Sequence, residues 1–203
     1  MIRAFPILAT ALVLAACSAT ESHDAASMDA RVASANTKAP PPRPANDLPA
    51  RSVLDAMPDF NGIGPLRFGM SAEQMRKAWG APLYGETPAD DSQACYYVRP
   101  NKESYDLLFM VEGDRFVRID VKADGKTAPG GGRVGMNMQQ VEKLYAGRVH
   151  VSPGKYDPGE KILGVMPSHG EKAKMIFETD ASGLVKSWRI GIPPQIDYVE
   201  GCS

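Results

Sequence analysis

The sequence predicts an α+β fold made of two tandem repeats, each with a short helix, or helix pair, on one face of an antiparallel sheet. Three observations predict this fold. A capped-helix motif occurs twice, about 66 residues apart. Each copy is followed by a pair of strand-like segments, and turn residues separate the two members of each pair. We place repeat one at about 59–125 and repeat two at about 129–203.

The two predicted helices begin at Ser71 and Asn137, which are good N-cap residues. Each has a glutamine three positions later that can bond back to the cap, as in a capping box, and a methionine before it that can form a hydrophobic staple. We expect Gly80 and Gly147 to end the helices. The apolar positions of each helix lie on one face, which indicates packing on a flat partner. These positions are Ala72, Met75, Ala78 and Trp79 in the first copy and Met138, Val141, Leu144 and Tyr145 in the second.

The flat partner is predicted from two hairpins rich in β-branched and aromatic residues. The first joins 107–111 to 115–121, and the second joins 173–179 to 184–190. Two more strands are expected at 94–99 and around 162–166. The pattern leaves the register of the last strand open. Val185 faces inward if it matches Val117 of the first copy, whereas an inward set of Leu184, Trp188 and Ile190 would place the opposite face of the strand inward.

The segment Gly69-Met-Ser-x-x-Gln-Met-x-x-x-x-Gly80-x-Pro82 resembles the helix motif of the BamE (SmpA/OmlA) lipoproteins. That resemblance implies a small periplasmic domain with helices on one face of an antiparallel sheet. Tandem helix-plus-sheet units with a disulfide are also similar to the β-lactamase-inhibitor protein, which grips an enzyme with its open sheet face. The chain departs from the BamE pattern by having two copies, the second without the Gly-x-Pro ending. Neither family assigns a functional residue here.

The N-terminus has the pattern of a bacterial lipoprotein. Arg3 precedes an apolar stretch at 4–16 that is too short to span a bilayer, so residues 1–16 are expected to be a signal peptide. The stretch ends in Leu-Ala-Ala-Cys17, which resembles a lipobox, and this implies cleavage before Cys17 and acylation of its thiol. Ser18, rather than aspartate, then implies the outer membrane, with the protein facing the periplasm. An ordinary secretory signal is the alternative.

Residues 17–51 are expected to form a lipidated, disordered tether rich in alanine and proline, and residues 52–203 one domain. The tether has almost no large apolar residues and includes three consecutive prolines at 40–42, so it cannot bury enough surface to fold. Such a linker holds a domain away from its membrane anchor.

Charge and cysteine count limit the classes of partner that the chain can have and the redox state of its cysteines. A net charge of -1, with acidic and basic residues mixed throughout, predicts no nucleic-acid partner and no polybasic membrane patch. With Cys17 used for lipidation, Cys95 and Cys202 remain as a pair in an oxidising compartment and are expected to form a disulfide. Two free thiols are the alternative.

The sequence offers no catalytic, metal-binding or cofactor-binding set. His150 and His169 lack further ligands at helix or hairpin spacing, and the Gly130-Gly131-Gly132 run has no Lys-Ser/Thr after it to bind phosphate. Carboxylates such as Asp90, Asp91, Glu112 and Asp114 fall in turns, where solvation is common. We therefore expect a chain without enzymatic activity, metal or cofactor.

Alternation along the strands predicts the candidate partner-binding face. If Val117, Ile119 and Val121 face the helices, the residues between them face the opposite way. An open sheet face that carries aromatic and arginine side chains is typical of protein-binding surfaces. The alternative is a face that is solvated or covered by the segment 150–170. The candidate residues are Tyr97, Arg99, Phe116, Arg118 and Asp120.

The leading functional hypothesis is a non-enzymatic, membrane-anchored protein-binding module for an envelope or secreted partner. It would be an inhibitor or immunity factor, or an accessory subunit of envelope assembly. Two alternatives from other classes are an envelope hydrolase acting on peptidoglycan or lipid, and a structural spacer between the outer membrane and the cell wall.

Overall fold

The computed structural model describes residues 53–90, 94–168 and 170–202. All of them belong to the second of the two units into which the chain divides, residues 42–203. The predicted signal peptide, the lipidation of Cys17 and the tether lie outside the described residues, as do Asp91 and His169.

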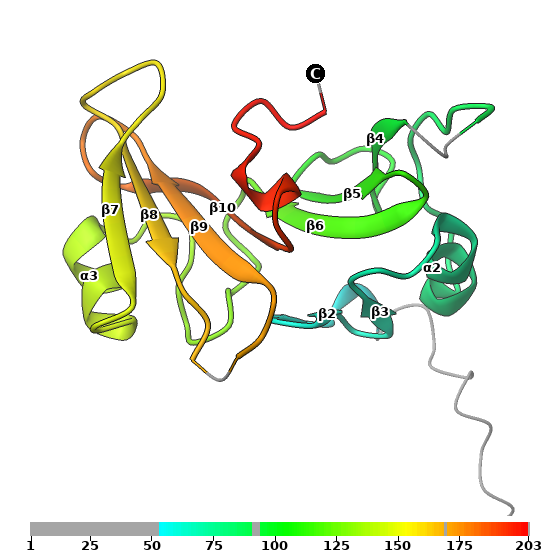
Figure 1. The fold of residues 1–203 in the computed structure, drawn as a ribbon, viewed down its shortest axis with the longest axis horizontal. Helices are drawn as coiled ribbons and strands as arrows, with labels where there is room; N and C mark the ends of the chain where they lie inside the picture. The colour runs from blue at the N-terminus through cyan, green and yellow to red at the C-terminus, as the bar shows by residue number, and fades with distance from the viewer. Residues whose placement is uncertain (1–52, 91–93, 169, 203) are drawn as a thin grey trace, which may run out of the picture. The chain divides into compact units, whose positions relative to one another are not determined.

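The fold is α+β and mostly antiparallel, and the described residues form two sheets and two α-helices (Figure 1). A three-stranded sheet has the order β1-β2-β3, and a seven-stranded sheet has the order β4-β5-β6-β10-β9-β8-β7. The elements are β1 (Pro58–Asp59), β2 (Gly62–Ile63), β3 (Leu66–Arg67), α2 (Ala72–Trp79), β4 (Cys95–Val98), β5 (Leu107–Glu112), β6 (Arg115–Val121), α3 (Met138–Leu144), β7 (Val149–Pro153), β8 (Lys161–Val165), β9 (Lys174–Thr179), β10 (Val185–Gly191) and the 3₁₀ helix η1 (Gln195–Asp197).

Both helices begin at the predicted capping boxes. The N–H of Gln74 donates to Ser71 Oγ at 3.2 Å, and the N–H of Gln140 donates to Asn137 Oδ1 at 3.0 Å. In each box the glutamine side chain accepts from the N–H of the cap residue at 2.9 Å. The helix α2 ends at Gly80 in the left-handed conformation, as expected. The helix α3 instead ends at Tyr145, two residues before Gly147.

Loss of either cap is expected to destabilise the domain modestly. Ser71→Ala and Asn137→Ala each remove the acceptor for one N–H at a helix start, which typically costs about 1 kcal/mol. Urea unfolding should show this decrease in both variants, while Ser71→Asp, which keeps an acceptor, stays within a few tenths of a kcal/mol of the parent. If neither alanine variant changes the unfolding midpoint, the caps do not contribute as the geometry indicates.

Both helices pack on the same face of the seven-stranded sheet. The Trp79 ring of α2 meets Phe109 edge-on with ring centroids 5.2 Å apart, and the Tyr145 ring next to α3 lies 5.6 Å from Phe177. Phe109 and Phe177 lie on one face of the sheet. The register of β5, β6, β10 and β9 places the cross-strand neighbours of both rings on that same face, and these neighbours are core residues. This face and the two helices enclose the main hydrophobic core.

A β-bulge in each hairpin decides which side chains enter the core. The β5–β6 register shifts between Met110 and Val111, and the β9–β10 register shifts between Val185 and Ser187. Because a bulge inserts one extra residue, the alternation changes phase across it. Val185 therefore faces the core together with Trp188 and Ile190, and Leu184 is exposed. Each alternative for β10 is correct on one side of the bulge only.

The same phase change corrects the prediction for Phe116. Its ring lies in the core, 5.7 Å from Phe109 and 5.1 Å from Phe68 by ring centroids, and not on the opposite face. The inward set of β6 is Phe116, Ile119 and Val121, so strict alternation from Val117 was the wrong assumption.

The second face of the seven-stranded sheet is partly covered by the chain's own C-terminal segment, residues 192–202. Its η1 turn packs against β6, β9 and β10 (Figure 1). The predicted disulfide is present: Cys202 bonds to Cys95 at the start of β4, with the two Cα atoms 5.2 Å apart. The segment 150–170 was the alternative cover; its residues up to 165 belong to the β7–β8 hairpin at the sheet edge, and Lys155 and Tyr156 in the hairpin loop contact Glu200 of the C-terminal segment.

Candidate binding surfaces

A buried polar cluster lies at the centre of the second face. Arg118 and Asp120 stand two residues apart on β6, and Arg118 Nη2 lies 2.6 Å from Asp120 Oδ1. On the neighbouring strands, Arg189 of β10 pairs with Glu178 of β9. Arg118 also donates to the hydroxyl of Tyr97 on β4, at 3.2 Å. The cluster thus joins four strands of the sheet through their outward side chains.

The two arginines hold the main chain of the C-terminal segment. Arg118 Nη1 donates to the carbonyl oxygens of Gln195, at 2.9 Å, and Tyr198, at 2.7 Å. Arg189 Nε donates to the carbonyl oxygen of Ile196, at 2.9 Å. All of these contacts are to main-chain oxygens, so the guanidinium groups recognise the path of the segment rather than its side chains.

Burial and charge shape the protonation of this cluster. Burial raises the pKa of the Tyr97 hydroxyl, and the negative charge of Asp120 raises it further. Burial by itself would lower the pKa of Arg118, but the hydrogen bonds and charge of Asp120 outweigh it, and the pKa is raised. The Tyr97 hydroxyl therefore remains neutral, and Arg118 remains a cation.

The structure brings three of the five candidate residues together, but they are not openly exposed. Arg118 is 3% exposed and Asp120 is 7% exposed, because the C-terminal segment covers them. The prediction of an open face is therefore wrong at these two positions, as it is at Phe116. Tyr97 joins the cluster, whereas Arg99 lies apart, with its guanidinium 4.1 Å from the ring centroid of Tyr105.

Sequence reasoning missed the partners that complete the cluster. Glu178 and Arg189 are charged residues inside otherwise apolar strands, and that pattern is a usable signal for a buried ion pair. The contribution of the C-terminal segment had no such signal, because it depends on main-chain oxygens.

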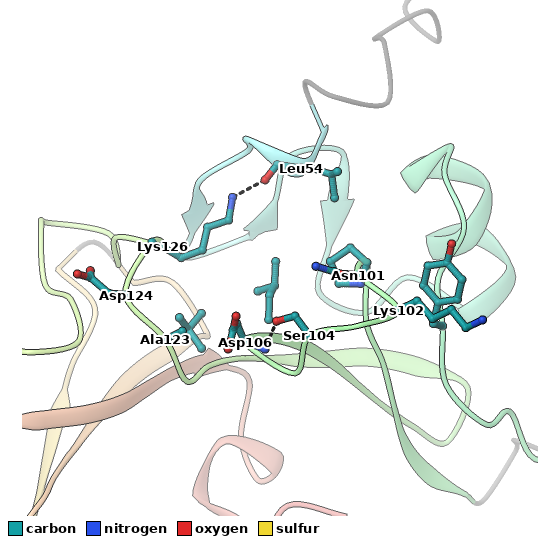
Figure 2. A pocket seen from close by; sticks show the side chains of 13 residues that line it. Leu54, Asn101, Lys102, Ser104, Asp106, Ala123, Asp124 and Lys126 are labelled. Carbon is teal, nitrogen blue, oxygen red and sulfur yellow. Dashed lines mark hydrogen bonds between the residues drawn. The ribbon is translucent and has the colours of Figure 1, made fainter.

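A pocket of about 510 Å³ lies at the loops that follow β4 and β6 (Figure 2). Leu54, Leu107 and Val121 supply apolar lining. Lys126 reaches across to the N-terminal end of the described chain, where its Nζ donates to main-chain oxygens of Leu54 and Ala56. Burial lowers the pKa of Lys126, and the charge of Asp55 opposes this. Through its two hydrogen bonds, Lys126 connects the loop after β6 to the N-terminal end of the described chain.

The described residues hold no group of three or more histidine, cysteine, aspartate or glutamate side chains placed to bind a metal ion. Within the same residues, no helix has the length and apolar character needed to cross a membrane.

The two edges of the seven-stranded sheet differ. Beyond β4, Tyr84 exchanges two main-chain hydrogen bonds of 2.8 Å with Arg99, so a neighbouring loop runs along that edge. No described strand pairs with the outer edge of β7. An unpaired edge offers main-chain donors and acceptors to another chain.

The pairing of β7 with β8 shows which groups point outward. The N–H of Met166 donates to the carbonyl of Arg148 at 3.1 Å, so alternate residues from Arg148 onward bond to β8. Val149 and Val151 therefore direct their N–H and C=O groups away from the sheet. Pro153 has no N–H to offer, which limits the open stretch to its N-terminal part.

Several exposed apolar side chains belong to β7 and to the elements directly before and after the β7–β8 hairpin. Three of the nine large apolar side chains that are most exposed among the described residues are in this group. Val151 of β7 is 38% exposed and Met166, just after β8, is 54% exposed. Leu144 is the last residue of α3. Four residues later, the Arg148 guanidinium also donates to the carbonyl of Met166. We call Leu144, Val151 and Met166 the β7-edge surface.

Comparison with known proteins does not assign this chain to a family. No protein-family model matches the sequence, and no curated protein matches it. Among solved structures, an extracellular protein containing a SCP domain from Bacillus anthracis str. Ames is similar at a TM-score of 0.40 and 14% identity. The match covers 62% of this chain and 44% of that chain, so the chain spans less than half the length of this neighbour. A likeness of this size assigns neither family nor function.

Proposed function

We propose that this chain is a non-enzymatic protein-binding module of the cell envelope. The open β7 edge with its exposed apolar side chains is the observation that carries the proposal. Exposed apolar surface next to unpaired main-chain groups is the usual composition of a surface that another protein covers. The partner would be an envelope or secreted protein, with the chain acting as its inhibitor or immunity factor, or as an accessory to envelope assembly.

We also propose the cellular setting. The signal-like N-terminus and Cys17 support an outer-membrane lipoprotein that faces the periplasm. The Cys95–Cys202 disulfide supports an oxidising compartment.

The tandem-repeat origin of the fold belongs to the same proposal. Gly69 donates to the carbonyl of Phe116 at 2.8 Å, and Gly135 donates to the carbonyl of Val185 at the same distance. The return bonds run from Phe116 to Met70 and from Val185 to Met136. Each pair joins the residues before a capped helix to the start of a bulged strand, β6 or β10. These matching contacts support two copies of one unit.

Site-specific photo-cross-linking of the full-length chain in the cells that produce it tests the proposed function. A benzophenone amino acid in place of Val151 is expected to give protein adducts after irradiation, because a partner would cover this residue. The matched control is Tyr105, an exposed aromatic side chain in the β4–β5 loop, outside the β7-edge surface.

Adducts that form at 151 and are absent at 105 support a partner at the β7 edge, and mass spectrometry of the adduct then names it. If irradiation gives no adduct at either position, or equal adducts at both, the proposal of a binding module at this edge fails. Membrane fractionation of the parent and of Cys17→Ala in the same cells tests the anchor, which should be lost in the variant.

A further inference from the structure

The polar cluster of the second face has the properties of a recognition site for a peptide main chain. A guanidinium carries five N–H donors, and those that Asp120 and Glu178 do not use need other acceptors when they are buried. In this structure three carbonyl oxygens of the C-terminal segment are those acceptors. Any peptide with the same backbone path would supply them equally well.

Two side chains of the C-terminal segment add selectivity. Ile196 is fully buried where η1 packs on β6, β9 and β10, and this face of β9 also carries the buried Ile176. The next residue, Asp197, pairs with Lys174 at the start of β9, with 2.6 Å between Oδ1 and Nζ. The face therefore has an apolar contact site for one residue of the segment and a cationic contact site for the next.

The disulfide holds the segment in this place. The segment leaves β10 after Gly191 and runs to Cys202, which is bonded to Cys95 of β4. Between η1 and that bond, Val199 is 41% exposed, and Glu200 contacts Lys155 and Tyr156 of the β7–β8 loop, with 2.9 Å between Lys155 Nζ and Glu200 Oε1. An occupant tethered at both ends has a very high effective concentration, on the order of millimolar or more, and excludes a competitor.

We propose that the second face of the sheet is a peptide-binding site, which the chain's own C-terminal segment fills in the disulfide-bonded form, and that the site takes peptides with an apolar residue followed by an acidic one. The proposal is independent of the proposed function, because it concerns the second face and not the β7 edge. It explains why two charged pairs are buried on a face that the domain core does not use.

Opening the site is a thiol–disulfide exchange. A dithiol reductant attacks the Cys95–Cys202 bond, becomes a disulfide itself, and leaves two cysteine thiols that carry its two protons. The C-terminal segment is then tethered at one end only, and a peptide at sufficient concentration can replace it.

The test uses the full chain with three changes, Cys95→Ser, Ile196→Asp and Cys202→Ser, which we call the released variant. The aspartate prevents the variant's own segment from occupying the apolar contact site again. Apart from Cys95, the residues of the sheet are unchanged. The probe is a fluorescein-labelled synthetic peptide with the sequence of residues 192–199, followed by fluorescence anisotropy. We expect saturable binding to the released variant and none to the disulfide-bonded parent.

An exchange of charge between the protein and the probe tests whether the probe binds in the same position as the chain's own segment. Lys174→Glu in the released variant should lower the affinity for the probe roughly tenfold, since an attraction becomes a like-charge contact. A second probe with lysine at the position of Asp197 should recover the lost affinity. The matched control is Lys77→Glu, an exposed lysine of α2 on the helix side, which should leave the affinity unchanged.

If the released variant unfolds cooperatively but binds neither probe at millimolar concentration, the proposal is wrong and the segment is only a structural cover. Binding that ignores the charge exchange also overturns it. If the released variant does not fold, hydrogen exchange of the parent decides. Reduction should then speed exchange at the amides of 196–198 at least tenfold while the β6 and β10 amides keep their protection, and unchanged protection at 196–198 rejects the proposal.

Discussion

Replacement of both Cys95 and Cys202 by serine is expected to lower the free energy of unfolding by about 4–5 kcal/mol. The bond closes a loop across a sequence separation of 107 residues, and the chain-entropy model assigns this amount to a loop of that size. The bond also ties the C-terminal segment across the second face to β4, so its loss exposes surface there. Urea unfolding of the chain starting at Ser18, with the midpoint and slope fitted together, measures the difference.

The control is the oxidised parent treated with dithiothreitol, which should unfold at the midpoint of the double serine variant. The serine variant itself should not respond to the reductant. A decrease below about 1 kcal/mol would mean that the loop is already restricted in the unfolded chain, and that the bond is less important for stability than its loop length implies.

The second large effect is expected at the buried ion pair of β6. Arg118→Ala leaves the Asp120 carboxylate without its cation under the C-terminal segment, and it removes the donors to the Gln195 and Tyr198 carbonyls. Removing one partner of a buried pair typically costs about 3–5 kcal/mol. The expected result is a decrease of this size in the free energy of unfolding, measured by urea unfolding at neutral pH.

A double variant, here called the paired variant, distinguishes the destabilisation caused by one unpaired buried charge from the stabilisation that the intact ion pair provides. Arg118→Met together with Asp120→Leu removes both charges while it keeps much of the volume, so it should be markedly more stable than Arg118→Ala. If the paired variant is as unstable as the single one, the carbonyl bonds to the C-terminal segment dominate rather than the uncompensated carboxylate. If Arg118→Ala loses less than about 1 kcal/mol, water reaches the cluster and the burial of these charges is overstated.

Local signals in the chain predict the helices and most strands. The capping boxes at Ser71 and Asn137 predict where both helices begin, because the cap, its glutamine and the staple residue are all neighbours in sequence. The hairpins are equally local, and β5, β6, β9 and β10 form where the apolar runs and turns place them. The disulfide follows from counting cysteines in an oxidising compartment.

The candidate site was predicted only in part, for a physical reason. Tyr97, Arg118 and Asp120 do share one face, because alternation along a strand is a local property. Phe116 does not, because the bulge beside it depends on how two strands pair and not on the residues of one strand. Arg99 is drawn away by its contact with Tyr105 in the next loop.

Taken alone, the sequence determines both helices with their caps, most strands of the larger sheet, the paired cysteines and the N-terminal lipoprotein pattern. Each of these rests on residues near one another or on composition. Tertiary structure alone decides the strand order with β6 beside β10, the phase of the two bulged strands and the burial of the polar cluster. The C-terminal segment shows the reason most clearly. Two of its main-chain oxygens bind Arg118, which lies 77 and 80 residues earlier in the chain. Such oxygens are the same in every residue, so no sequence pattern marks them as the occupants of that face.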